Sequence, residues 1–281
     1  MPQAIEDKVQ KVVQEGYSFE ARKTFFDGLE LVQKNIPAFV GIVIFMLITS
    51  YLLGLAGVTG IVINSILVSP LVVGSFFLIA DKVKKGERVE PNDIYSSLTY
   101  ALPLILIGLL SSLILAVVLS PSLISMQNSG MLAFYQQVID GADPATLEMP
   151  QASGTASLVL LLNMIPFLYL AIAFYWGTLF ILFHKVSFFR ALELSRLVVT
   201  KRWWAHFRLS LLFAFVLIVL FLLVSPLALL PTAYGIATQV VSTIGTAVYY
   251  AAIYEGFRQV VGVGGEEDAD RPDTLMDHLV S

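Results

Sequence analysis

Six long stretches of the chain contain no Asp, Glu, Lys or Arg and consist almost wholly of apolar residues. A helix needs roughly 20 such residues to cross the hydrocarbon core of a bilayer, so each stretch is expected to be a transmembrane helix. The whole chain is 57% hydrophobic and 14% charged, whereas soluble domains carry about 25% charged residues. The sequence therefore predicts an all-α membrane protein with six spans, at about Ile36 to Ala56, Thr59 to Ala80, Tyr100 to Ser120, Ser157 to Phe183, Leu209 to Leu230 and Thr232 to Ile253.

All 17 Lys and Arg residues lie in the two terminal segments and in the connections between spans two and three and between spans four and five. The other three connections hold none, and the long one from Pro121 to Ala156 carries Asp140, Asp143 and Glu148 instead. Cytoplasmic loops of membrane proteins are enriched in Lys and Arg. We therefore expect a multi-pass protein of the bacterial inner (plasma) membrane with its N-terminus and C-terminus in the cytoplasm.

Two segments that lead into spans one and five have apolar residues at helical spacing. Phe25 and Leu29 share one face of residues 19–35, and Phe188 and Leu192 share one face of residues 186–200. Each segment is expected to be an amphipathic helix lying in the membrane interface. Aromatic residues gather at such interfaces, so the predicted interfacial residues are Phe25, Phe188, Trp203 and Trp204.

The two interfacial segments also resemble each other. Phe25–Leu31 and Phe188–Leu194 are identical at five of seven positions, and each segment is followed by two spans. We interpret the chain as two parallel pseudo-repeats, about residues 19–86 and 186–262, joined through spans three and four within a membrane domain of residues 19–261. Chance is the alternative, because Phe and Leu are common here. Residues 1–18 are expected to be a polar N-terminal segment, and residues 262–281 a flexible acidic tail.

Several short patterns in the chain carry a family resemblance. They are Gly16–Phe19, Gly28–Asn35, a PL..G pattern at Pro70–Gly74, and an AL..S..L pattern at Ala191–Leu197 that is followed by Trp203-Trp204. The chain resembles a group of uncharacterised bacterial six-span membrane proteins and the membrane domain fused to some glycerophosphodiester phosphodiesterases. The resemblance covers nearly all of residues 16–260 and implies a six-span fold. The His/Glu/Asp metal motifs of the phosphodiesterase domain are not in the sequence, so that activity is not expected.

The sequence holds no pattern typical of an active site. There is no Cys, and the three histidines, His184, His206 and His278, are far apart, whereas a metal site needs three or four convergent ligands. A Gly-rich phosphate loop, a nucleophile elbow and an HExxH motif are all absent from the sequence. We therefore expect no enzyme, no catalytic, cofactor-binding or metal-binding residue, no cofactor and no nucleic-acid partner. His184 and His206 are expected at interfacial or solvated positions.

Spans two and six contain most of the polar side chains that suggest a site. Two interpretations remain open for them: they hydrogen-bond between packed helices, or they line a polar cavity between the two halves. The candidate intramembrane polar cluster is Asn64, Ser69, Gln239, Ser242, Thr243 and Thr246.

The expected function is non-enzymatic. The chain would organise or assist other membrane components, either lipid or protein, so membrane lipids and another membrane protein are the two expected classes of partner. The alternative is an uncoupled transporter or lipid-handling carrier that uses a polar cavity between the halves. Ion coupling is not expected, because such proteins usually place ionisable residues within their spans.

Overall fold

The computed structural model describes residues 2–139, 141–143, 146–148, 150 and 154–263, and this part of the chain is all-α. Helix boundaries follow local chemistry: Asn35, for example, accepts a hydrogen bond from the backbone N–H of Ala38 and so caps α3. The helices are α1 (Pro2–Glu15), α2 (Ala21–Lys34), α3 (Ile36–Gly54), α4 (Gly57–Ile63), the π-helix η1 (Asn64–Val68), α5 (Ser69–Lys84), the 3-10 helix η2 (Pro91–Tyr100), α6 (Ala101–Asn128), α7 (Met131–Ile139), α8 (Gly154–Phe174), α9 (Gly177–His184), α10 (Phe188–Lys201), α11 (Trp203–Val224), the 3-10 helix η4 (Ser225–Leu229) and α12 (Pro231–Val260).

Six helical segments of the described chain are long and apolar enough to cross a membrane. The predicted six-span, all-α membrane fold is therefore confirmed. Every predicted span has a counterpart, and most observed segments are longer than predicted because their polar ends remain helical. The segments are Ile36–Gly54, Gly57–Lys84, Pro91–Asn128, Ser157–His184, Trp203–Leu229 and Thr232–Val260.

The prediction that span three ends near Ser120 is wrong, because α6 continues through Pro121 to Asn128. A proline inside a helix removes the N–H that would bond the carbonyl four residues earlier, here that of Val117. The Ser120 hydroxyl donates to this same carbonyl at 2.7 Å. The side chain thus replaces the missing backbone donor, as Ser and Thr do in transmembrane helices that contain proline.

Span four is interrupted at Tyr175 and Trp176, between α8 and α9, whereas Pro166 lies inside α8. The backbone N–H of Trp176 donates to Ser195 Oγ at 3.2 Å, and Ser195 Oγ donates to the carbonyl of Ala173 at 2.7 Å. One buried serine of α10 therefore satisfies both sides of the break.

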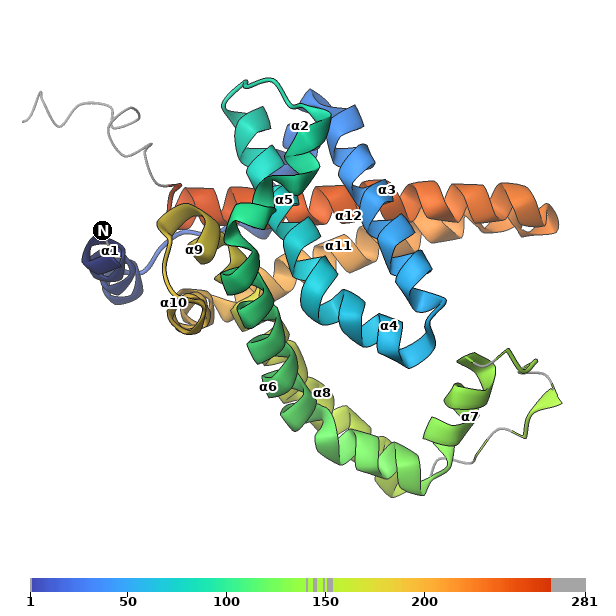
Figure 1. Ribbon diagram of the computed structural model, residues 1–281. Coiled ribbons are helices and arrows are strands. Elements are labelled where there is room, and N and C mark those ends of the chain that lie inside the picture. Colours follow the sequence, from blue (N-terminus) through green and yellow to red (C-terminus); the bar gives the residue numbers. More distant parts are fainter. Residues whose placement is uncertain (1, 140, 144–145, 149, 151–153, 264–281) are drawn as a thin grey trace, which may run out of the picture.

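The spans meet at one end of the molecule and diverge toward the other (Figure 1). The pair α11 and α12 runs in one direction, the pair α6 and α8 in another, and the α3–α4 hairpin lies between them. The loops that hold Lys85 and Lys185 lie at the shared end, because Lys84 pairs with Glu255 of α12 and His184 hydrogen-bonds Gly262 just after α12; we call it the basic end. The core lies there too, and its members Leu104, Phe180 and Tyr254 are completely buried.

The opposite ends of the spans, which we call the far ends, are mostly exposed. Between 0% and 39% of each span's most apolar window is buried inside the protein. Leu113, Leu161 and Leu222 illustrate this, since each is at least 60% exposed. Apolar side chains exposed in this way are suited to contact with lipid.

The two segments predicted to be amphipathic helices are helical, and both helices lie at the basic end. Helix α2 precedes α3 and packs along α12, and α10 precedes α11 and packs on α8 and α9. The polar N-terminal segment also contains a helix, α1, which the sequence analysis missed. Its Ile5 and Val9 are buried against the core, and its Glu6 pairs with Arg190 of α10 at 2.8 Å. The predicted acidic tail lies almost wholly outside the described residues, at 264–281.

Candidate functional site

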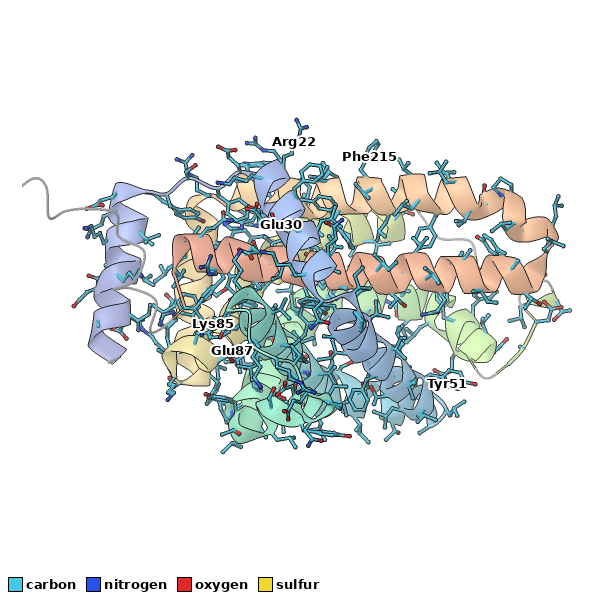
Figure 2. All side chains as sticks on the ribbon, turned by 90° about the horizontal axis from the view of Figure 1, so that it is seen from above. Arg22, Glu30, Tyr51, Lys85, Glu87 and Phe215 are labelled. Atoms are coloured by element: carbon cyan, nitrogen blue, oxygen red, sulfur yellow. The ribbon has the colours of Figure 1, made fainter. Side chains whose placement is uncertain are left out.

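A groove of 780 Å³ lies between the start of α2 and one side of α11. We call it the α2/α11 groove. Three ionisable residues line it at the basic end, Glu20, Arg22 and Arg208. Figure 2 shows Arg22 and Phe215 projecting from the same edge of the molecule. The rest of the lining is apolar and runs down α11: Leu211, Leu212, Ala214, Phe215 and Ile218, with Ala21 on the α2 side.

The apolar wall of this groove descends into the membrane region. Leu211, Phe215 and Ile218 recur at helical spacing on one face of α11, and each is more than half exposed. Leu211 and Ile218 are seven positions apart, or about 10 Å of helix. Neither Arg22 nor Arg208 forms an ion pair within the part of the chain that the structure describes. The groove therefore joins two arginines that have no ion-pair partner in the described chain to an apolar wall along α11.

A buried histidine fixes the α2 side of this groove to α11. The His206 side chain is completely buried, so the expectation that it is interfacial or solvated is wrong. The Tyr17 hydroxyl donates to the carbonyl of Val198 at 3.0 Å and lies 2.7 Å from His206 Nε2. Because Tyr17 has a single hydroxyl proton, Nε2 must carry the imidazole proton, and Nδ1 accepts from the hydroxyl of Tyr175. Burial raises the pKa of Tyr17, which keeps this hydroxyl protonated.

Residue Phe19 completes this aromatic enclosure, since its ring lies 4.0 Å from the His206 ring between centroids. Arg202 Nε also donates to the carbonyl of Tyr17 at 3.1 Å. Glu20 and Arg22 follow directly in the chain. The segment before α2 is thus held on α11 by several contacts, and the two walls of the α2/α11 groove keep a defined spacing.

A second groove, of 630 Å³, lies between α3 and α12 and is called the α3/α12 groove. Gln239 and Thr243 of the predicted polar cluster line it. Gln239 is exposed, whereas Thr243 is buried and donates its hydroxyl proton to the carbonyl of Gln239 at 2.8 Å. The other lining residues are all apolar apart from the phenol of Tyr51: Val40, Ile44, Leu47, Ile48, Tyr51, Leu52, Val240 and Ile244.

A third, smaller cavity of 200 Å³ is lined by hydroxyl groups of spans two, three and four. Ser69 of the predicted cluster belongs to it. The π-helix η1 and Pro70 form one side, and Gly108 of α6 lies against them, where a Cβ would be 2.6 Å from Pro70 Cγ. Proteins often place π-helical turns at functional sites. The hydroxyls of this hydroxyl-lined cavity are those of Ser65, Ser69, Ser111, Ser112 and Thr178.

The structure does not bring the predicted polar cluster together in one cavity. Asn64 donates to Ser50 of α3 at 3.0 Å, which is the helix-packing interpretation. Gln239 lines the α3/α12 groove, so the two amides of the predicted cluster have different surroundings. Ser242 and Thr246 are half-buried on α12.

The predicted interfacial residues lie at the basic end in varied settings. Phe25 is buried against the core, and Phe188 is half-buried there. Trp203 stacks on Phe207 with ring centroids 5.0 Å apart and donates Nε1–H to the carbonyl of Tyr169 at 3.3 Å. Trp204 is 67% exposed, which suits a side chain in the headgroup region of a membrane.

Comparison with known proteins finds no matching family model, no matching curated protein and no matching solved structure. Within the described residues, no group of three or more His, Asp or Glu side chains could hold a metal ion. Sequence reasoning missed Arg22, Arg208 and the hydroxyl-lined cavity. Their members come from different helices, so no spacing along the chain signals them.

Proposed function

We propose that this chain is a non-enzymatic, multi-pass protein of the bacterial inner membrane that binds phospholipid and thereby organises the lipid around it. One observation supports this proposal above the others. In the α2/α11 groove, Arg22 and Arg208 lie at one end of an exposed apolar wall. A phospholipid is complementary to this arrangement, because its phosphate would meet the arginines and its acyl chains would lie along the apolar wall.

The two arginines suit the phosphate. A guanidinium presents a planar set of N–H donors that matches phosphate geometry and stays charged at any physiological pH. Basic residues near a membrane surface contribute about 1 kcal/mol each to the attraction of anionic lipid groups. Arg22 also lies over the ring of Phe26, 5.9 Å from its centroid, which orients the side chain.

The carboxylate of Glu20 favours a headgroup that also carries a positive charge. It lines the same rim as the arginines. A purely anionic headgroup would leave this carboxylate facing like charge, whereas the ammonium of an ethanolamine headgroup would pair with it. The combination of two guanidiniums and one carboxylate therefore favours phosphatidylethanolamine among the common phospholipids.

The apolar wall fixes where the acyl chains lie and contributes little to the affinity for a lipid. Acyl chains in the bilayer are already in hydrocarbon, so moving them onto Leu211 or Phe215 gains little from the hydrophobic effect. Most of the preference for a bound lipid must then come from the headgroup contacts. Lipid binding should therefore depend on the arginines and change little with conservative substitutions in the wall.

The orientation of the groove is part of the proposal. The basic end carries the Lys and Arg residues of the connections, so we place it on the cytoplasmic side with both termini. The groove then faces the inner leaflet. The same arrangement agrees with the two interfacial helices of the predicted repeat, and with the resemblance to the uncharacterised bacterial six-span proteins.

A second candidate function is an uncoupled lipid-handling carrier. The hydroxyl-lined cavity favours it, because five hydroxyls at the junction of three spans offer a polar surface within the membrane region. The two candidates differ in a reconstituted vesicle. A carrier would move fluorescent phospholipid between leaflets, and Ser69→Leu together with Ser111→Leu would stop that movement, whereas a lipid-binding protein leaves the leaflets unchanged.

The binding proposal is tested by the thermal stability of delipidated protein in detergent. Added phosphatidylethanolamine is expected to raise the Tm, because a ligand that binds only the folded state stabilises it. The Arg22→Gln/Arg208→Gln variant should lose this increase, and Glu20→Gln should lose the preference for phosphatidylethanolamine over phosphatidylglycerol. An equal increase in wild type and in the double arginine variant would contradict the proposal.

A further inference from the structure

The α3/α12 groove combines a long apolar side with one exposed side-chain amide. Its α3 side runs from Val40 to Leu52, which is about 18 Å of helix. Its α12 side carries the exposed amide of Gln239. None of the described residues that line the groove is charged. Its length and its apolar lining suit an elongated apolar occupant.

The amide of Gln239 lacks a hydrogen-bond partner within the part of the chain that the structure describes. Thr243 bonds the backbone carbonyl of Gln239 and leaves the side chain unsatisfied. Gln239 lies seven residues after Thr232, where span six begins, and therefore about 10 Å from that end of the span. The polar headgroup zone is roughly 5–7 Å thick on each side, so a span that enters the membrane at Thr232 would carry this amide into hydrocarbon.

An unsatisfied amide in hydrocarbon costs several kcal/mol. A lipid acyl chain offers it neither a donor nor an acceptor. A transmembrane helix with a polar side chain can offer the amide both a donor and an acceptor. A second copy of this chain meets the requirement without any further component, because one Gln side chain both donates and accepts, and two of them can pair across a two-fold axis.

The surroundings of Gln239 suit such close contact. Gly235, one helical turn away on the same face, has nothing within 4 Å of the position its Cβ would take. Small residues let helix backbones approach closely in membranes. Val240 and Ile244 flank the amide and are exposed, so they offer apolar area on both sides of it.

We propose that the α3/α12 groove is the surface through which two copies of this chain associate in the membrane, with their Gln239 amides hydrogen-bonded to each other. This site is distinct from the α2/α11 groove, so the proposal does not depend on lipid binding. The Gln239 pair would fix how the two copies are aligned along each other.

The test uses purified full-length protein labelled with donor or acceptor dye and reconstituted into lipid vesicles at a series of densities. Energy transfer is expected to fall with dilution as dimers dissociate. Gln239→Leu should weaken association by about 3- to 30-fold, the range that intramembrane hydrogen bonds span. Gln239→Asn keeps the amide and should restore part of the loss. The Thr238 hydroxyl already donates to Tyr234 within its own helix at 2.9 Å, so Thr238→Val is the control and should change nothing.

Cross-linking locates the interface. Because the sequence has no Cys, a Val240→Cys variant should form one disulfide between two copies, whereas Leu222→Cys on α11 should form none. A protein that stays monomeric at every density would overturn the proposal. So would a dimer that Gln239→Leu leaves unchanged, or one that cross-links through Leu222→Cys and not through Val240→Cys.

Discussion

A Cβ placed on Gly28 of α2 would lie 2.5 Å from the backbone nitrogen of Ala252 in α12. The two helices therefore approach each other backbone to backbone, at a distance that only glycine permits. This contact joins the first interfacial helix to the last span. It fixes the position of α2, and with it the α2 wall of the α2/α11 groove.

The first prediction concerns this contact. Gly28→Ala should force α2 and α12 apart and lower stability by about 1–3 kcal/mol, as overpacking of a close contact does. The Tm of the variant in detergent measures the effect. Gly41→Ala on α3 is the control, since nothing lies within 4 Å of its Cβ position. A wild-type Tm for Gly28→Ala would mean that the helices lie farther apart.

The second prediction concerns Glu255, a carboxylate that is 1% exposed and 2.6 Å from Lys84 Nζ. This ion pair joins the end of α12 to the end of α5. Lys84→Met should destabilise the protein by about 3 kcal/mol, because it leaves a buried charge without its partner. The double variant Lys84→Met/Glu255→Leu should recover most of that loss.

The matched control for this ion pair is the exposed pair of Lys34 and Glu30, which lie 3.1 Å apart on α2. Lys34→Ala should cost about 0.5 kcal/mol or less, because solvent screens exposed pairs. Both effects are read from denaturant unfolding in the same detergent. A double variant no more stable than Lys84→Met would show that the Glu255 charge is not what makes Lys84 necessary.

The third prediction concerns topology. The absence of Cys makes single-cysteine labelling unambiguous. Gln127→Cys at the far end of α6 should react with a membrane-impermeant reagent added to intact cells, and Glu87→Cys at the basic end should react only after lysis. Both side chains are exposed, so access to them differs only by the side of the membrane. Labelling of Glu87→Cys in intact cells would reverse the proposed orientation.

The fourth prediction compares two residues of α10. Phe188 packs against the core, so Phe188→Asp should lower the yield of folded protein by placing a charge in an apolar contact. Arg190→Gln should change the yield little, because its ion pair with Glu6 is more than a third exposed on both sides. Size-exclusion profiles of the two variants give the comparison. Equal yields would place Phe188 toward solvent.

The spans were predictable because hydrocarbon imposes one requirement, a long apolar helix without charge. The ends of the spans were not predictable, because polar residues such as Lys84 remain helical when a residue of another helix pairs with them. Pro121 was misread as the end of a span, since nothing in the local sequence shows that Ser120 replaces the missing donor.

The candidate sites were harder to predict from the sequence. Arg22 and Arg208 are 186 positions apart and meet only because Tyr17 and His206 hold the segment before α2 on α11. The spacing of apolar residues along the sequence shows which face of a single helix is apolar. It cannot reveal a groove whose walls come from two helices. The sequence does identify Gln239 as a polar residue in a span. It does not show whether another helix of the same chain supplies a hydrogen-bond partner for the Gln239 amide.

Native mass spectrometry of the detergent-purified protein tests lipid binding by the α2/α11 groove most directly. The wild-type chain should retain one phospholipid, and Arg22→Gln/Arg208→Gln should retain none under the same activation, since the loss of two charges lowers affinity about 30-fold. Arg88→Gln, an exposed basic residue outside the groove, should retain lipid as the wild type does. Equal retention by wild type and by the double arginine variant would contradict the account.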